Sequence, residues 1–144
     1  MSNNDSGIVR PTIHVVAAAL YDSAGRVLIA ERPRGKHLSG RWEFPGGKID
    51  AGETETQALT RELAEELGVA FGAGHPLLHV SHDYDDRRVE ISLWVVDDFS
   101  GEPQGLDGQL LKWVSPAKLQ DEDMLAADVP FIDALQRLYN ERLP

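Results

Sequence analysis

Three glutamates, Glu62, Glu65 and Glu66, are spaced so that a helix would bring their carboxylates together. The stretch Thr54–Leu67 contains no glycine or proline and is followed directly by Gly68, so the sequence predicts a helix there. Successive helical residues are rotated by about 100°, which places the three carboxylates on one face as i, i+3 and i+4 neighbours. Such an oxygen-rich face suits Mg²⁺ or Mn²⁺, ions that keep several waters and share substrate phosphates.

The same pattern has a second interpretation, because acidic helix faces are common on solvated surfaces. Like charges on one face weaken an isolated helix by ~0.2–0.5 kcal/mol per pair. Leu59, Leu63 and Leu67 form an adjoining apolar stripe that would pack on a sheet under either interpretation. The residues before and after the glutamates favour the metal interpretation.

Constrained residues at fixed spacing run from Gly47 to Val69: Gly47, five residues, Glu53, seven residues, and then Arg61-Glu62-Leu63-Ala64-Glu65-Glu66-Leu67-Gly68-Val69. This run resembles the complete Nudix box, with Leu63 and Val69 at its two aliphatic positions. The resemblance implies an α/β fold, specifically an α/β/α sandwich around a mixed sheet, in which the box forms a loop, a helix and another loop. It also implies an enzyme that hydrolyses a nucleoside diphosphate linked to another group.

The resemblance also implies roles for single residues. Mg²⁺, or Mn²⁺ in its place, would be held by Glu62, Glu65, Glu66 and the backbone carbonyl of Gly46. Glu53 and Arg61 would pair and brace the loop against the helix, although Arg61 as a phosphate ligand is the competing interpretation. Hydrolysis of a polyphosphate needs charge neutralisation and an aligned water more than covalent chemistry. The resemblance to MutT-type enzymes makes Glu62, the glutamate that follows the box arginine, the first choice for the base that activates this water.

The similarity to the MutT branch of the family covers most of the chain. Trp42–Ile49 resembles the strand and turn that precede the box, and Arg32 matches an arginine near the nucleotide. Asp107 lies between two further MutT-like segments, Gly101–Pro103 and Gly108-Gln109, where MutT has a metal-binding glutamate. Phe44 is expected either to line the base pocket or to pack in the core. The substrate-binding residues that this resemblance suggests are Arg32, His37, Phe44, Gly47, Lys48 and Asp128.

Asp128 departs from the MutT pattern. The segment Leu125–Pro130 matches one in which MutT carries an asparagine against the guanine edge. An amide donates and accepts hydrogen bonds, whereas an ionised aspartate only accepts unless burial keeps it protonated. The Ala-Asp-x-Pro pattern also resembles the branch that hydrolyses cytidine triphosphate. A helix N-cap ahead of Pro130 would also explain an aspartate here, and capping does not exclude base contact.

These resemblances imply hydrolysis of 8-oxo-dGTP to 8-oxo-dGMP and pyrophosphate, which cleanses the nucleotide pool. The close alternative is a pyrophosphohydrolase of CTP, dCTP or modified pyrimidine triphosphates. A catalytically silent nucleotide-binding Nudix module is an alternative of another class, and the presence of every box glutamate argues against it.

The elements that must position these residues follow from hydrophobic patterning and turn residues. A charged segment, 83–88, reads as the solvated tip of a hairpin, and Pro45-Gly46-Gly47 is expected to break the strand before it. Strands on both sides of the box helix, with a second helix at the end, indicate an α/β layered domain. The expected strands are Ile13–Leu20, Arg26–Ala30, Trp42–Phe44, Leu77–Val80, Val89–Val96 and Leu110–Val114, and the second helix is Pro130–Leu138.

Bulk properties limit the remaining choices. The 144 residues fit a single domain over 1–144, with residues 1–10 expected to be flexible. The absence of cysteine excludes disulfides, thiolate metal sites and cysteine nucleophiles. A net charge of −10 disfavours a nucleic acid polymer as partner, and no apolar run is long enough to cross a membrane. The expectation is a cytoplasmic monomer or weak dimer with a nucleoside triphosphate as substrate.

Overall fold

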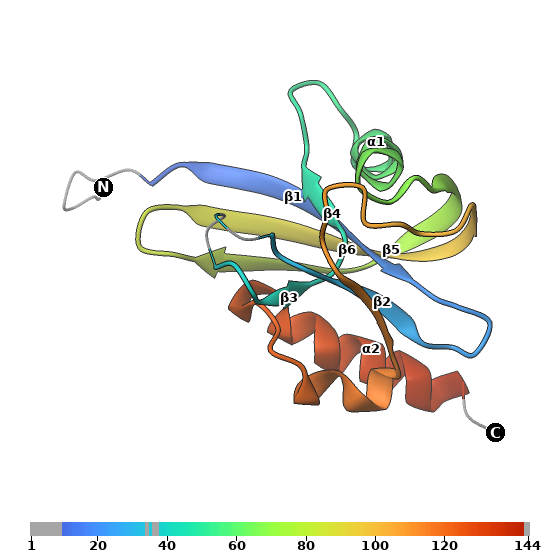
Figure 1. Cartoon of the computed structure of the whole chain (residues 1–144). Helices are drawn as coiled ribbons and strands as arrows, with labels where there is room; N and C mark the ends of the chain where they lie inside the picture. The colour runs from blue at the N-terminus through green and yellow to red at the C-terminus, as the bar shows by residue number, and fades with distance from the viewer. Residues whose placement is uncertain (1–9, 34, 36–37, 143–144) are drawn as a thin grey trace.

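The structure, a computed structural model, describes residues 10–33, 35 and 38–142 (Figure 1). His37, one of the predicted substrate-binding residues, lies outside these described residues. The strands are β1 (Thr12–Leu20), β2 (Val27–Glu31), β3 (Trp42–Glu43), β4 (Gly46–Lys48), β5 (Ala70–Asp83), β6 (Arg88–Ser100) and β7 (Leu111–Val114). The helices are α1 (Glu55–Leu67) and α2 (Val129–Arg142), and two 3₁₀ turns, η1 (Pro116–Asp121) and η2 (Ala126–Asp128), precede α2.

The strands form a four-stranded sheet in the order β4-β1-β6-β5 and a three-stranded sheet in the order β3-β2-β7. The larger sheet is mixed, because β1 runs parallel to β6 while β4 and β5 are antiparallel to their neighbours. Figure 1 shows α1 on one side of the strands and α2 on the other. The predicted α/β/α arrangement with a mixed sheet is therefore confirmed. No helix within the described residues is both long and apolar enough to cross a membrane.

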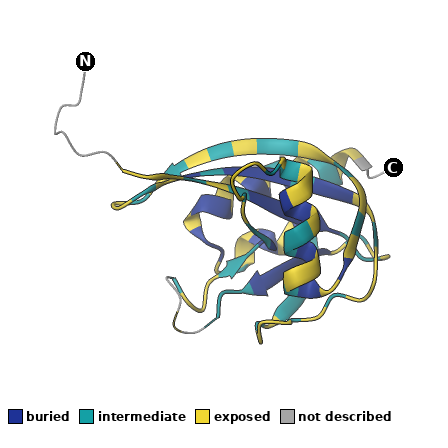
Figure 2. Ribbon diagram, turned by 90° about the horizontal axis from the view of Figure 1, so that it is seen from above, coloured by how far each residue is buried: buried dark blue, intermediate teal, exposed yellow. Residues whose placement is uncertain are grey.

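The second part of strand β1, residues 16–20, is buried on both faces and so divides the core into two clusters. Val16, Ala18 and Leu20 face α1, whereas Ala17 and Ala19 belong to the cluster on the α2 side. Figure 2 shows buried residues concentrated where strands and helices meet. The predicted apolar stripe of the box helix, Leu59, Leu63 and Leu67, is fully buried in the first cluster. Each leucine stabilises this contact by roughly 1.5–3 kcal/mol, which presses the glutamate-bearing helix onto the sheet.

Residues next to each end of α1 explain where the helix begins and where it ends. Thr54 is the N-cap, and its hydroxyl accepts a hydrogen bond from the Gln57 backbone N–H at 3.1 Å while the Gln57 side chain accepts from the Thr54 N–H at 2.9 Å. This reciprocal arrangement satisfies two N–H groups that the helix leaves without partners. Gly68 ends the helix with a φ of 69°, a left-handed conformation that glycine adopts without a Cβ penalty.

The first residue of α1 is also anchored to the sheet by a polar network. Glu55 accepts hydrogen bonds from the indole N–H of Trp94 at 2.8 Å and from the hydroxyl of Ser92 at 3.0 Å. Ser92 in turn contacts the Nδ1 atom of His79, and His79 Nε2 lies 2.7 Å from a Glu90 carboxylate oxygen. The helix that carries the box glutamates is therefore held to β6 by hydrogen bonds at its start and by leucines along its length.

Four elements differ from the sequence prediction, and one of them, β6, extends to Ser100 beyond the expected Val89–Val96. Strand β5 spans Ala70–Asp83 rather than Leu77–Val80, because Gly72, Gly74 and a proline interrupt its alternation while register shifts keep it paired with β6. Gly46–Lys48 does more than break a strand, since it forms β4 and pairs with β1. A Cβ atom at Gly46 would lie 2.0 Å from the Val16 carbonyl oxygen, so only glycine allows this approach. Helix α2 is longer at both ends than Pro130–Leu138.

Candidate active site

A cavity of about 500 Å³ collects residues from segments far apart in the sequence. Its size lies in the range of pockets that hold small-molecule ligands. Glu53 and Arg61 are the two described residues of the predicted set that do not line it. The predicted residues that do line it are Arg32, Phe44, Gly46, Gly47, Lys48, Glu62, Glu65, Glu66, Asp107 and Asp128.

Glu62 and Glu66 lie against each other at the α1 side of the cavity, and their carboxyl groups share a hydrogen bond. Burial, followed by the charges of Glu62 and Glu43, raises the pKa of Glu66 to about 8, although a hydrogen bond from the Gly46 backbone acts in the opposite direction. The space beside them depends on Gly47, because a Cβ there would lie 2.4 Å from the Glu62 carboxylate. Two carboxylates are thus held together in a place that disfavours negative charge.

Glu65 is arranged differently, since its side chain is 61% exposed and pairs with Arg61 at 3.2 Å. Within the described residues, no three histidine, aspartate or glutamate side chains gather as ligands of one metal ion. Mg²⁺ is usually bound through one or two carboxylates while waters and substrate phosphates complete its shell. The half-buried pair Glu62 and Glu66 fits such an ion, because a divalent cation would offset the repulsion between them.

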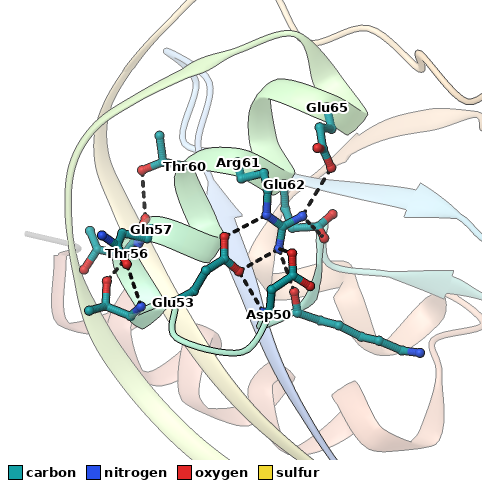
Figure 3. A network of polar contacts seen from close by, with 10 residues as sticks. Asp50, Glu53, Thr56, Gln57, Thr60, Arg61, Glu62 and Glu65 are labelled. Atoms are coloured by element: carbon teal, nitrogen blue, oxygen red, sulfur yellow. Dashed lines mark hydrogen bonds and ion pairs between the residues drawn. The ribbon is translucent and has the colours of Figure 1, made fainter.

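Arg61 is the centre of an ion-pair network behind the cavity (Figure 3). Its Nε and Nη2 atoms donate to the two carboxylate oxygens of Glu53 at 2.8 and 2.9 Å, a bidentate arrangement. Because of these bonds, Arg61 holds the pKa of Glu53 well below its usual value, at about 2. The predicted pair is formed, and the engaged guanidinium favours a bracing role over phosphate binding. The other partners of the guanidinium are Glu62 at 2.9 Å, Glu65 at 3.2 Å, the Lys48 carbonyl at 2.9 Å and Asp50 at 3.4 Å.

Phe44 and Asp128 form a second wall of the cavity. The Phe44 ring is buried and meets Phe131 edge-on with centroids 6.3 Å apart, so this residue both packs in the core and lines the cavity. Its backbone N–H donates to the Oδ2 atom of Asp128 at 3.2 Å. Asp128 is 5% exposed and ends the turn η2, one residue before α2 begins. Burial, followed by the charge of Glu43, raises the pKa of Asp128 to about 7.

The raised pKa of Asp128 predicts a pH-dependent contribution to stability. Its folded pKa of about 7 lies above the ordinary aspartate pKa of 3.8, so between these pH values the folded protein binds a proton that the unfolded chain does not. Stability from this group is complete below the lower pKa and is lost as the pH rises through the higher one, with a slope approaching ~1.4 kcal/mol per pH unit. Asp128→Asn has no carboxyl group to titrate and should not show this loss. The free energy of unfolding of the variant, relative to that of the wild type, should therefore increase as the pH rises.

Urea unfolding of both proteins between about pH 5 and 8 measures this difference. Other titrating groups cancel, because the two proteins share them. Parallel stability curves would show that Asp128 is ionised throughout this range and would contradict the prediction.

Two residues that line the cavity, Tyr84 and Arg87, were not predicted from the sequence pattern. They belong to the 83–88 segment, which was expected to be only a solvated hairpin tip. The structure corrects this for both residues, since each is half-buried and the Arg87 guanidinium lies 4.8 Å from the centre of the Tyr84 ring. A tyrosine and an arginine within a run of aspartates were the available signal, but a turn residue's direction depends on the packing of the hairpin.

Arg32 and Glu43 pair at the cavity edge, with Arg32 Nη1 3.1 Å from a Glu43 carboxylate oxygen. Glu43 also lines the cavity, and its charge acts on both Glu66 and Asp128. Lys48 is exposed at the rim. The cavity therefore combines carboxylates suited to a cation with Arg32, Lys48 and Arg87, which suit phosphate oxygens.

Comparison with known proteins agrees with this arrangement. The family model of the NUDIX domain matches residues 11–135. The chain is 36% identical to the CTP pyrophosphohydrolase of Escherichia coli over 85% of its length and 91% of that protein. It is 32% identical to the 8-oxo-dGTP diphosphatase of Escherichia coli over 88% of its length and 98% of that protein.

Structural comparison gives the same result. The solution structure of the Escherichia coli ORF135 protein superposes with a TM-score of 0.82 at 35% identity, over 92% of this chain and 94% of that one. The match of the family model and the curated relatives together establish what the residue pattern from Gly47 to Val69 implied. This chain belongs to the Nudix hydrolase family.

Proposed function

We propose that the protein is a Mg²⁺-dependent pyrophosphohydrolase of nucleoside triphosphates, with 8-oxo-dGTP as its preferred substrate. The observation that carries this proposal is the shared cavity, in which the carboxylates of α1 face the same space as Phe44 and Asp128. The end of the cavity with the α1 carboxylates suits a cation and phosphates, and the end with Phe44 and Asp128 suits a nucleotide base. A relative that is 32% identical over 98% of its own length is named an 8-oxo-dGTP diphosphatase.

The proposed reaction is attack of water on the β-phosphorus, which breaks the bond to the bridging oxygen and releases 8-oxo-dGMP and pyrophosphate. Glu62 would accept the proton of the attacking water, and the bond from Arg61 Nη1 at 2.9 Å orients its carboxylate. Arg32 and Lys48 would bind phosphate oxygens and align the chain of phosphates. Phe44 and Asp128 would hold the base, the first through its ring and the second through hydrogen bonds to the base edge.

Nudix hydrolases generally need a divalent metal. Glu62 and Glu66, with Glu65, Asp107 and the Gly46 carbonyl as further candidates, are the residues that would hold Mg²⁺, with Mn²⁺ as a substitute. When bound, the ion would neutralise phosphate charge and lower the pKa of the attacking water. We propose that the enzyme acts on nucleotides of the cytoplasm.

A second candidate function is the hydrolysis of CTP, dCTP or modified pyrimidine triphosphates. The observation that favours it is the buried carboxylate of Asp128, at the position where the MutT resemblance implies an amide against guanine. An ionised aspartate accepts a hydrogen bond from the cytosine amino group, and a protonated one donates as well. A relative that is 36% identical to this chain is named a CTP pyrophosphohydrolase.

The test compares kcat/KM for 8-oxo-dGTP, dGTP, CTP and dCTP in the presence of Mg²⁺, with pyrophosphate release as the readout. We expect 8-oxo-dGTP to exceed dGTP by at least about a hundredfold, because a buried group that must pair with the base rejects an analogue that cannot satisfy it. Equal or faster turnover of a cytidine nucleotide would overturn the base assignment and leave the chemistry intact. Binding of nucleotide without any turnover would identify a silent module instead.

A further inference from the structure

The segment between β6 and β7 carries Asp107 and crosses the C-terminal end of α1. The backbone N–H of Gln104 donates to the Leu67 carbonyl at 3.0 Å, and that of Leu106 donates to the Glu66 carbonyl at 3.1 Å. The last carbonyls of a helix have no partner within the helix, so these bonds satisfy groups that would otherwise need water. They bring the segment to the same turn of α1 that bears Glu65 and Glu66.

Gln109 adds a side-chain bridge between the same two elements. Its Nε2 atom donates to the Glu66 backbone carbonyl at 3.2 Å, and its Oε1 atom accepts from the Asp107 backbone N–H at 2.9 Å. Both ends of one planar amide are therefore used, and the residue lines the cavity. Asp107 is exposed, and the hydrogen bond that the structure gives it is this one to Gln109.

The backbone around this bridge is tightly folded, which limits where the amide can lie. Gly108 has a φ of 81° and its N–H donates to the Gly105 carbonyl at 3.0 Å. A Cβ atom at Gly105 would lie 2.1 Å from the Gln109 carbonyl oxygen and 3.2 Å from its Oε1 atom. The turn therefore sets the backbone of residue 109, and the side chain spans the remaining gap to α1.

We propose that Gln109 is a positioning residue that sets the place of Asp107 relative to Glu66. This inference rests on the proposed function, in which both carboxylates serve the same metal ion. Removal of the amide would leave α1 and the backbone bonds of Gln104 and Leu106 in place, but the peptide of Asp107 would lose its link to the helix. The carboxylate of Asp107 would then sample positions out of reach of an ion held by α1.

The experiment compares Gln109→Met, which keeps the length of the side chain but removes the amide, with the matched control Gln104→Met. Gln104 is exposed on the same segment, and its backbone N–H survives the substitution. The first readout is the Kd for Mn²⁺ without nucleotide, from the electron paramagnetic resonance signal of free Mn²⁺. The others are kcat and KM for the best of the four nucleotides. Each substitution is also made in an Asp107→Asn background.

We expect Gln109→Met to weaken Mn²⁺ binding and to lower kcat by about tenfold each, as substitutions of residues that orient metal ligands commonly do. Gln104→Met should match the wild type. In the Asp107→Asn background the Gln109 effect should vanish, because the residue through which it acts is already lost. Gln109→Asn, which keeps an amide but is one methylene too short for both bonds, should show the same loss if Gln109→Met fails to fold.

Two results would overturn the inference while the proposed function stands: Gln109→Met indistinguishable from Gln104→Met, or an equal loss with and without the Asp107 carboxylate. A wild-type protein that neither binds Mn²⁺ nor hydrolyses any of the four nucleotides would instead remove the proposed function itself.

Discussion

Glu66→Gln is expected to lower kcat/KM by about a thousandfold or more while the protein remains folded. Glutamine keeps the volume of the side chain and removes the charge that a divalent cation needs, and metal assistance contributes several kcal/mol of transition-state stabilisation. Folding should survive, because Glu66 sits where burial and the charge of Glu62 disfavour the ionised form. The measurements are pyrophosphate release with Mg²⁺ and urea unfolding without added metal.

The sign of the stability effect can be checked against pH. The pKa of Glu66 is raised from 4.5 to about 8, so the stability that this group contributes is present at low pH and lost as the pH rises through that window. Above about pH 8 and without metal, Glu66→Gln should therefore be at least as stable as the wild type. Glu102→Gln, an exposed glutamate outside the cavity, is the matched control and should keep full activity. Turnover of Glu66→Gln near the wild-type rate would contradict the metal assignment.

Replacement of Arg61 is expected to have the second largest effect, with Arg61→Met losing about 10- to 100-fold in kcat/KM. The arginine neutralises Glu53 and Glu62 together and donates to the Lys48 carbonyl, so its loss would release the loop before α1 and leave the carboxylates to repel one another. Arg61→Lys should recover only part of the activity, because an ammonium cannot bind both Glu53 oxygens in the planar arrangement of a guanidinium.

The bracing role and the phosphate-binding role of Arg61 make different predictions. A brace acts on the position of Glu62, so the loss should fall mainly on kcat, and Glu53→Gln should reproduce most of it. A phosphate ligand acts on the substrate, so the loss would fall on KM and Glu53→Gln would retain activity. Arg137→Met, on the exposed face of α2, controls for the loss of one arginine.

Much of the candidate site was predictable because its residues are close in sequence. The spacing of Glu62, Glu65 and Glu66 on one helical face depends only on helix geometry, and Gly68 ends the helix through its own backbone freedom. The Glu53–Arg61 pair likewise joins residues only eight positions apart. Local rules sufficed for these features.

The limits of prediction lie in contacts between distant segments. The predicted length of strand β5 was too short, because its pairing with β6 continues through glycines and a proline that local patterns indicate as breaks. Tyr84 and Arg87 were assigned to solvent, because the direction of a turn side chain is set by the curvature of the hairpin over the cavity. Neither feature has a signal within a short window of residues.

The sequence by itself determined the family, the chemistry of the box and the helix that bears it, since each follows from residue types at fixed short spacing. Only the tertiary structure decided that Glu62 and Glu66 form a half-buried pair while the side chain of Glu65 stays 61% exposed. It also decided that Asp128 meets Phe44 across 84 positions of sequence. The physical reason is that burial and hydrogen-bond partners, which decide the charge of a carboxylate, come from segments brought together only by packing of the sheet and helices.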